Sequence, residues 1–401
     1  MFKYAKIKYV LLFVIIIWEP LQIFILKFDA ANRMTGFLIA LTILLNIANA
    51  DFIKAGFRMP VVLWTIWVIY AFFNTATMGA MADFTYYGLF ITITRPLMVL
   101  WVISSEKFKD RKILFDIIIT GLYIRMLIIL IFETTRANDL FRLGLKIDSN
   151  AIGISALILI ILLYLRFLYK EIDLKRLLVL VIIPFYIILA TASRMAFGGF
   201  AILLVSHFYI NRSKNLLKNL AILFFGTFIV LGIFNFVIKN TYLGDRLSQT
   251  NEQSAELVYY NKVRGTVLEK FGDRGIFYVL GYEIFREHPV RGVGLRNFPN
   301  YLMYGKVVLH SEFMVQLCEL GIIGSLFFVL FFGWIGKNIL YYQKNDIENR
   351  KINEGYIIGL FIVLFLGLVI FQYNDPITFL LTGVIIAYLL NKKELNKPEA
   401  D

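Results

Sequence analysis

Arg194 occupies an unusual place in the chain, between two apolar runs. It belongs to ILATASRMAFGG, residues 188–199, which follows RLLVLVIIPFY and continues into FAILLVSHFYI. A charge in such a place is costly unless it caps a helix, reaches a polar surface or meets a ligand. Because the planar guanidinium group matches two oxygens of one phosphate, Arg194 is a candidate for binding an anionic ligand.

A histidine stands at the edge of another apolar run. His310 lies in LHSEFMVQLCELGIIG, directly before that run begins. A neutral imidazole accepts a proton near pH 7, so His310 is a candidate general base for an attacking hydroxyl group. His207 is better explained by an interfacial position, and His288, which precedes Pro289, by the end of a helix.

The motifs of several large enzyme classes are missing. Cys318 is the single cysteine, which excludes an intramolecular disulfide and a cysteine-based metal cluster. The sequence has no GxxxxGK[ST], no HExxH and no His or Cys at metal-ligand spacing. VRGVGLRN has two glycines but lacks the third glycine and the strand–helix context of a dinucleotide site. We therefore expect no metal and no cofactor.

Composition indicates a membrane protein. Hydrophobic residues make up 59% of the 401 residues and charged residues 17%, with a mean hydropathy of +0.72. A water-soluble chain of this length does not need so much apolar surface, whereas a chain that crosses a bilayer many times does. Lys and Arg outnumber Asp and Glu by 41 to 28. In a membrane protein that excess is first explained by topology, so we expect no nucleic-acid partner.

Apolar runs of about 17–23 residues recur along the whole chain. We therefore predict an all-α integral membrane protein with about twelve transmembrane helices, the first of them retained rather than cleaved as a signal peptide. The predicted spans are 8–26, 35–50, 59–78, 86–103, 113–132, 150–168, 176–191, 195–210, 216–238, 312–336, 355–371 and 375–391.

Charge in the connections predicts the orientation. If the N-terminus is cytoplasmic, every inner segment is basic, from MFKYAKIK to NKKELNKPEAD, while the short outer loops carry few cations. This is the bias expected when positive loops stay inside. Both termini are therefore predicted to be cytoplasmic, and the turn that carries Arg194 to be extracytoplasmic.

One connection is much longer than the others. Residues 239–311 form a hydrophilic segment on the predicted outer side, with helices expected around 251–270 and 274–288. Long loops in compact proteins are commonly functional. This one carries cations that run against the positive-inside bias, among them Arg274, Arg291 and Arg296, which suggests an anionic ligand at that face. The predicted organisation is thus 1–238 (nine spans), 239–311 (the loop) and 312–401 (three spans and a basic tail).

Charges also lie inside predicted spans, where they are usually paired or functional. These are Glu19, Arg95, Asp116 and Arg125. Glu19 and Arg95 fall at similar depth, which favours an ion pair between them. The alternative is a polar cavity for a lipid head group.

Three stretches together resemble the O-antigen ligase and O-antigen polymerase superfamily. ATASRMAFGG resembles its T-x-S-R motif. DRGIFYVLGYEIFREHPVRGVGLRNF followed by LHSEFMVQLCELGIIG is similar to its loop motif and its H-N-x-x-L-x-x-x-x-E-x-G motif. LGLKIDSNAIGISALIL is similar to a weaker G…N-x-x-A region. The chain departs from the family pattern at Ser311, where Asn is usual, and at Phe277 or Tyr278, where Trp is usual.

The resemblance implies a GT-C type membrane glycosyltransferase whose catalytic residues here are Arg194, Arg274 and His310. The arginines would stabilise a lipid diphosphate, and the histidine would accept or orient the proton of the attacking hydroxyl. The family uses no metal. The residues expected to contact substrate are Asn150, Ser193, Arg291, Arg296 and Ser311.

The activity implied is polysaccharide repeat-unit polymerisation at the outer face of the cytoplasmic membrane. An oligosaccharide on undecaprenyl diphosphate would be the donor and a second glycan the acceptor, with a chain-length regulator and a flippase as partners. Two alternatives stay open: a ligase that transfers the finished glycan to lipid A core, and a transporter or flippase for an anionic glycolipid. A transporter would predict two related halves and a basic cavity through both leaflets. Here no halves repeat and, apart from Arg95 and Arg125, the surplus cations gather on one side.

Overall fold

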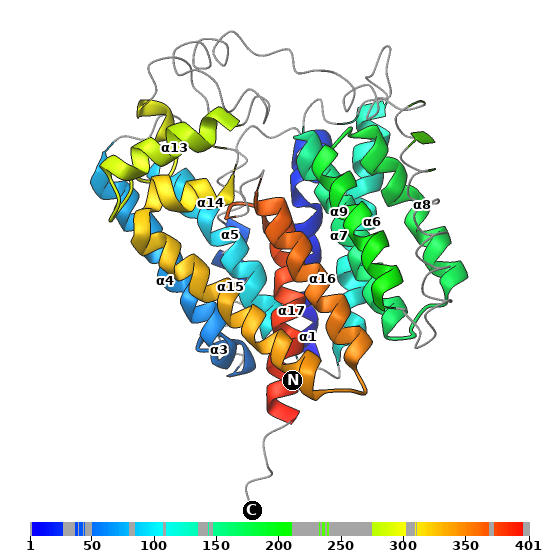
Figure 1. Cartoon of the computed structure of the whole chain (residues 1–401). Helices are drawn as coiled ribbons and strands as arrows, with labels where there is room; N and C mark the ends of the chain where they lie inside the picture. The colour runs from blue at the N-terminus through cyan, green and yellow to red at the C-terminus, as the bar shows by residue number, and fades with distance from the viewer. Residues whose placement is uncertain are drawn as a thin grey trace, which may run out of the picture.

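The computed structural model shows a bundle of helices (Figure 1). Every regular element among the described residues is helical, which confirms the predicted all-α class. The structure describes residues 2–26, 37–38, 40–42, 44, 50–79, 85–106, 110–134, 143, 147–210, 232, 235–236, 239, 275–301, 309, 311–368 and 373–395.

Helices lie at the predicted spans except 35–50 and 216–238, which fall largely outside the described residues. Six helical stretches in the described ranges are long and apolar enough to cross a membrane, which indicates an integral membrane protein. The count of about twelve spans stays a prediction. The elements are α1 (Phe2–Pro20), η1 (Leu21–Leu26), α3 (Ala50–Gly56), α4 (Met59–Met78), α5 (Tyr86–Ser104), α6 (Arg111–Thr134), α7 (Ser149–Leu168), α8 (Leu174–Ala190), α9 (Arg194–Ile210), α13 (Gly275–Glu287), η4 (Phe298–Tyr301), α14 (Glu312–Met314), η5 (Val315–Glu319), α15 (Leu320–Asn345), α16 (Arg350–Gly367) and α17 (Pro376–Leu395).

The bundle has two distinct ends. Helices α13 and α14 and the first turns of α7, α9 and α17 lie at one end, here called the loop end. The N-terminus and the last turns of α5, α15 and α17 lie at the other, here called the terminal end (Figure 1). Of the long segment predicted between the ninth and tenth spans, the described part contains α13, close to the helix expected at 274–288. The helix expected around 251–270 lies outside the described residues.

The core of the bundle is made of helices that are apolar on all sides. α17 packs against α5, α7 packs against α8 and α9, and α1 packs against α6. Along α7 and α17 most side chains are buried, including Leu157, Ile161 and Ile385. A helix that is hydrophobic all round has no polar face to turn to water and must be covered by other helices or by lipid. These central helices therefore form a rigid frame for whatever lies at their ends.

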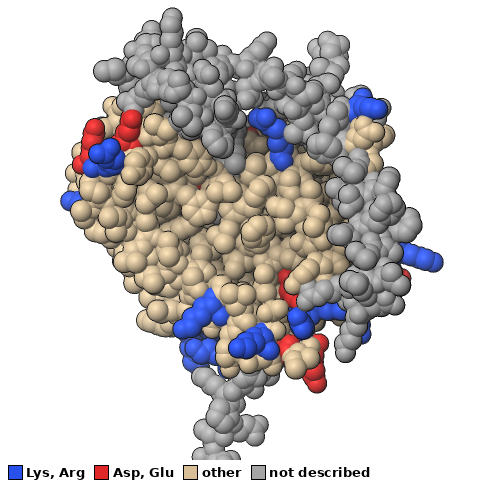
Figure 2. All heavy atoms as spheres, in the orientation of Figure 1, with Lys and Arg blue, Asp and Glu red and all other residues tan. Residues whose placement is uncertain are grey.

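Charged side chains avoid the middle of the face shown in Figure 2. A broad belt there carries no Lys, Arg, Asp or Glu, and the charged groups gather above and below it. Large apolar side chains are exposed on the helices, for example Phe73, Val179 and Val329. Exposed apolar surface of this extent is costly in water but favourable in lipid. The distribution supports a membrane-embedded belt with a polar zone at each end.

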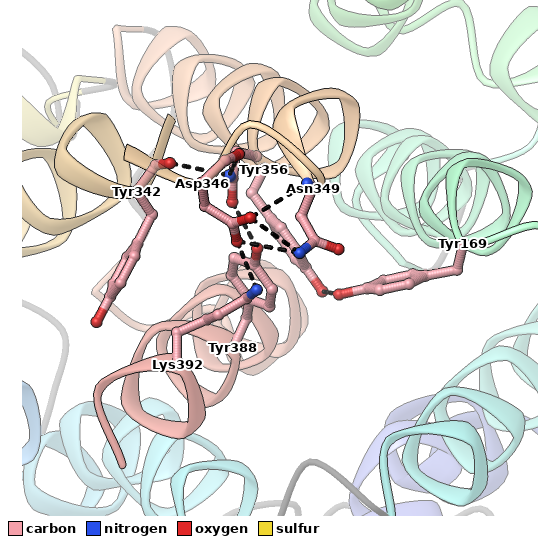
Figure 3. A network of polar contacts seen from close by, with 8 residues as sticks. Tyr169, Tyr342, Asp346, Asn349, Tyr356, Tyr388 and Lys392 are labelled. Carbon is pink, nitrogen blue, oxygen red and sulfur yellow. Dashed lines mark hydrogen bonds and ion pairs between the residues drawn. The ribbon is translucent and has the colours of Figure 1, made fainter. Parts of the chain in front are cut away.

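A polar network closes the terminal end between α7, α15, α16 and α17 (Figure 3). The Lys392 ammonium lies 2.5 Å from a carboxylate oxygen of Asp346, and Asn349 donates to the same carboxylate. Burial alone would raise the pKa of Asp346, but the hydrogen bonds from Lys392 and Asn349 hold it below its usual range. Deeper in, the Tyr356 and Tyr388 rings stack with centroids 4.3 Å apart. These contacts fix the helices relative to one another at the end opposite α13.

Candidate active site

A short, internally bonded turn presents Arg194. Helix α8 ends at Ala190 and α9 begins at Arg194, with Ala192 between them at a positive φ of 50°. The buried Ser193 side chain accepts a hydrogen bond from the Ala196 amide at 3.4 Å. Arg194 is exposed and makes no hydrogen bond or ion pair with any residue that the structure describes. Its backbone is held firmly while its guanidinium remains available to an external anion.

Two residues predicted to contact substrate meet beside this turn. The Ser193 hydroxyl donates to the side-chain oxygen of Asn150 at 3.2 Å. Asn150 lies in the first turn of α7, where its amide donates to the Asp148 carboxylate at 2.9 Å. Gly153 permits the approach of the two helices, since a Cβ at that position would lie 2.7 Å from the Cβ of Ser193. The structure thus brings Asn150 and Ser193 together directly next to Arg194.

The residues of the second motif form a folded unit at the loop end. The segment that follows α13 runs along the start of α15: the Gly294 amide donates to the Glu319 carbonyl at 2.7 Å, and the Ile322 amide to the Pro289 carbonyl at 2.9 Å. The buried Glu319 carboxylate then accepts the Arg296 amide at 3.0 Å. A charged acceptor for a backbone amide makes a strong hydrogen bond. The glutamate of the E-x-G motif therefore fixes the backbone of Arg296.

Two glycines make this contact possible. Gly292 and Gly321 have φ values of +67° and +66°, a region that side chains with a Cβ rarely adopt. A Cβ on Gly292 would lie 2.4 Å from the carbonyl carbon of Glu319, and one on Gly321 would lie 2.5 Å from the Val290 oxygen. The two backbones can approach only because neither residue has a side chain. This explains the glycines of the two motifs as structural partners.

Arg291, predicted to contact substrate, is bonded to α4. Its guanidinium donates to the Asn74 side chain at 3.1 Å and to the Thr77 hydroxyl at 2.6 Å. The Asn74 amide in turn donates to the Arg291 carbonyl at 2.7 Å, and the Leu295 amide donates to the Thr75 hydroxyl at 2.9 Å. Arg291 therefore ties the segment after α13 to the end of α4. It does not line the cavity described next.

Arg296 lines a cavity of about 330 Å³ at the loop end of the bundle. Its backbone has a positive φ of 64°, held by the Glu319 contact. The cavity lies between α1, α5, α6 and the first turns of α7 and α17. Three arginines and three carboxylates line it together with an aromatic and apolar wall. The lining residues are Ile15, Trp18, Glu19, Leu38, Arg95, Met98, Arg125, Asp148, Ala151, Ile154, Arg296, Asn374, Asp375, Pro376 and Ile377.

The predicted ion pair between Glu19 and Arg95 is wrong, because Glu19 has a different partner. In the structure Glu19 pairs directly with Arg125, whose side chain is 2% exposed and also donates to the Ile16 carbonyl at 3.2 Å. Arg95 interacts with Glu19 and Asp375 electrostatically but forms no hydrogen bond with the described residues. The difference arises because span counting gives depth but not rotation about the helix axis. The structure instead contains a polar cavity at these residues, which was the alternative to the ion pair between Glu19 and Arg95.

The other two cavity carboxylates cap helices. Asp375 accepts hydrogen bonds from the Ile377 amide at 3.0 Å and from the Thr378 amide at 3.1 Å, at the start of α17. Asp148 plays the same role at the start of α7. Side-chain acceptors of this kind satisfy amides that a helix leaves unpaired in its first turn.

The predicted catalytic residues Arg274 and His310 lie outside the described residues, so their place relative to Arg194 stays a prediction. On either side of His310 in the chain, Leu309 and Ser311 are buried. The Ser311 hydroxyl is buried and has no hydrogen-bond partner among the described residues.

The segment after Ser311 is anchored by a buried carboxylate. Glu312 is fully buried, and its two oxygens accept the Gln316 side-chain amide at 2.6 Å and the Tyr373 backbone amide at 3.1 Å. Gln316 accepts the Trp67 indole N–H at 2.8 Å. These residues belong to α14 and to η5, a single π-helical turn, which is a feature often found at functional sites. The contacts join the entry of α15 to α4 and to the start of α17.

Sequence reasoning did not assign Trp18, Arg125 or Asp375 to the site. Arg125 gave a signal, since a charge inside an apolar run is unusual. Asp375 in N-D-P-I-T gave the signal of a helix cap before proline. Nothing in the sequence indicates that Trp18 faces the same cavity.

A family model described as O-antigen ligase matches residues 178–329. A search of curated proteins gave no match. The matched segment includes the turn with Ser193 and Arg194 and the folded unit built on Gly292, Glu319 and Gly321, while most of the cavity wall lies before or after it. Over residues 178–329 the match confirms the resemblance of the sequence motifs to the O-antigen ligase and polymerase superfamily.

Proposed function

We propose that this protein is a polysaccharide repeat-unit polymerase. It transfers a glycan from undecaprenyl diphosphate to an acceptor glycan at the outer face of the cytoplasmic membrane. The observation that carries the proposal is the family match over the segment that presents Arg194 and fixes Arg296. The arginine-lined cavity at the same end of the bundle supports it.

The proposal places the loop end outside the cell and both termini in the cytoplasm. Support comes from the basic segments that connect the helices at the terminal end, such as the one before Arg111 and the one around Lys392. Cytoplasmic connections are enriched in Lys and Arg in membrane proteins. In this orientation Arg194 reaches the zone in which lipid head groups lie.

The chemistry follows from the donor. The sugar hydroxyl of the acceptor attacks C1 of the donor glycan as the bond from C1 to the diphosphate oxygen breaks. His310 takes the hydroxyl proton, and undecaprenyl diphosphate leaves with the bonding electron pair. Attack from the face opposite the leaving group inverts the configuration at C1. Because the diphosphate is already a good leaving group, the reaction needs neither a nucleotide nor a metal.

Arg194 and Arg274 stabilise the charge that grows on the diphosphate oxygens. Such a contact accelerates the reaction only where it is stronger in the transition state than in the ground state. Losing one typically costs about 2.7–4 kcal/mol of barrier. Asn150 and Ser193 hold the turn beside Arg194, and Arg296 and Ser311 contact the glycans.

A ligase is the second candidate, because the matching family model is described as O-antigen ligase. Ligase and polymerase use the same donor and differ only in the acceptor. In either case a flippase supplies the donor at the outer face, and a chain-length regulator is expected as a partner of the polymerase.

One experiment separates the two. The purified protein in lipid nanodiscs is incubated with an undecaprenyl-diphosphate-linked repeat unit alone, and the products are separated by size. A polymerase gives a ladder of glycans. Absence of any product until lipid A core is added would identify the ligase, and absence of transfer with both acceptors would contradict the proposed function.

A further inference from the structure

Arg95 lines the cavity without forming a hydrogen bond or ion pair to any residue that the structure describes. Glu19 is already bound to Arg125, and Asp375 is already bound to the amides at the start of α17. Both carboxylates therefore act on Arg95 only from a distance. The Arg95 Nε atom is buried and has no hydrogen-bond partner among the described residues.

An arginine in this state is expensive to keep within a membrane protein. Charged groups inside spans usually pair with one another or face a cavity that admits a ligand or water. Burying a donor without a partner costs about 1–3 kcal/mol, and more when the donor is charged. A structural role for Arg95 would require a direct partner, and the described residues offer none. An anion that enters the cavity would supply it.

Several features of the cavity favour a phosphate. Arg95, Arg125 and Arg296 line one space of about 330 Å³. The cavity also contains Glu19, Asp148 and Asp375, but Glu19 is paired with Arg125, and the two aspartates accept hydrogen bonds from the first-turn amides of α7 and α17. Guanidinium groups bind phosphate through two parallel hydrogen bonds.

The depth of Arg95 suggests which phosphate it meets. Arg95 lies nine residues after Tyr86, the first residue of α5, which corresponds to roughly 14 Å along the helix at 1.5 Å per residue. Arg194, in contrast, is the first residue of α9 at the same end. Ile15, Leu38 and Met98 form an apolar wall beside Arg95. The lipid-side phosphate is the one joined to the prenyl chain, so it is the phosphate that would lie beside this apolar wall and Arg95.

We propose that Arg95 binds the lipid-side phosphate of the polyprenyl diphosphate donor. This inference rests on the proposed function and deepens it. The binding site for the donor then extends beyond the matched segment 178–329 into α5, with Arg125 and its partner Glu19 as the adjacent wall. Arg95 binds substrate and product alike, because undecaprenyl diphosphate is what remains after transfer.

The test compares Arg95→Gln and Arg95→Lys with the wild type in nanodiscs. Initial rates of glycan transfer are measured over a range of donor concentrations, and again with added undecaprenyl diphosphate as a product inhibitor. Arg176→Gln is the matched control, since Arg176 is an exposed cation near the start of α8, at the terminal end. Thermal unfolding of each variant is recorded alongside.

We expect Arg95→Gln to raise both the donor KM and the inhibition constant of undecaprenyl diphosphate about tenfold to a hundredfold. The effect on kcat should be much smaller, because a group that binds ground state and transition state equally changes KM. Arg95→Lys keeps the charge but loses the two parallel hydrogen bonds, so a smaller rise in KM is expected. Arg176→Gln should resemble the wild type.

The outcomes separate the inference from the proposed function. An unchanged KM and inhibition constant in both Arg95 variants, with an active wild type, would overturn the inference and leave the proposed function standing. If Arg95→Gln does not accumulate in membranes, Arg95→Lys alone decides between the two. If the wild type transfers no glycan, added undecaprenyl diphosphate should still raise its Tm but not that of Arg95→Gln, which would support the inference and contradict the proposed function. Equal shifts in Tm for both proteins would overturn the inference.

Discussion

Arg194 and Arg291 show that two arginines at one end of a protein can have different tasks. Arg291 donates to Asn74 and Thr77 and so has a structural role, whereas Arg194 has no partner among the described residues. Sequence alone ranked both as ligands of an anion, since both run against the positive-inside bias. Arg291 and its partner Asn74 are 217 residues apart in the sequence. A local sequence pattern cannot predict such a contact.

Arg194→Ala should abolish nearly all glycan transfer without affecting insertion. The expected loss is about 10²–10³ in kcat, as for other groups that stabilise charge in a transition state. Arg194→Lys should recover only part of the rate, because an ammonium group cannot pair with two phosphate oxygens at once. Rates are measured with saturating donor, and membrane content by immunoblot. A fully active Arg194→Ala protein would remove this residue from the mechanism.

Arg291→Ala should instead lower stability. It removes two hydrogen bonds to α4, each worth about 0.5–1.5 kcal/mol. Asn74→Ala removes one of the same contacts, so the double variant should be less destabilised than the sum of the single variants. The measurement is the Tm in detergent for the four proteins of the cycle. Strict additivity would show that the two side chains do not interact.

At the scale of elements, the sequence predicts where each helix lies along the chain. It does not predict how a helix is rotated about its own axis. Runs of apolar residues fix where α4, α5, α6 and α7 lie, because a bilayer of given thickness demands a given length. The same runs do not say which face of α6 turns toward α1. That is why Arg125, and not Arg95, was found paired with Glu19. The cavity at the loop end follows from packing and could not be read from hydropathy.

The start of α15 depends on Gly321, and we predict that Gly321→Ala disrupts the loop end. A Cβ there would lie 2.5 Å from the Val290 oxygen at a φ of +66°, so the segment that carries Arg296 must shift. The variant should show a lower Tm and reduced transfer, since strain of this kind costs about 1–3 kcal/mol.

Gly333→Ala is the matched control for that variant. Gly333 lies on the same helix, and a Cβ there would meet no atom within 4 Å. Alanine also has the higher helix propensity, so the Tm should be unchanged or slightly higher. If Gly321→Ala behaved like Gly333→Ala, the fixed contact between the two motifs would be contradicted.

At the scale of the whole molecule, the proposal requires that the two ends face different compartments. Because the chain has only Cys318, which is buried, a Cys318→Ala background allows single cysteines to report accessibility. Arg286→Cys on α13 should react with a membrane-impermeant maleimide in intact cells. Arg176→Cys at the terminal end should react only after permeabilisation. The reverse pattern would place the cavity on the cytoplasmic side and contradict the proposed localisation.

The central claim is that the loop end uses a lipid diphosphate as leaving group for glycan transfer. The most direct measurement is the appearance of undecaprenyl diphosphate when the purified protein acts on a lipid-linked repeat unit, quantified by lipid chromatography together with the glycan product. The account predicts one undecaprenyl diphosphate released for each glycosidic bond formed, and release by Arg194→Ala slowed about 10²–10³-fold. Glycan growth without release of the lipid diphosphate, or release by the Arg194→Ala protein at the wild-type rate, would contradict it.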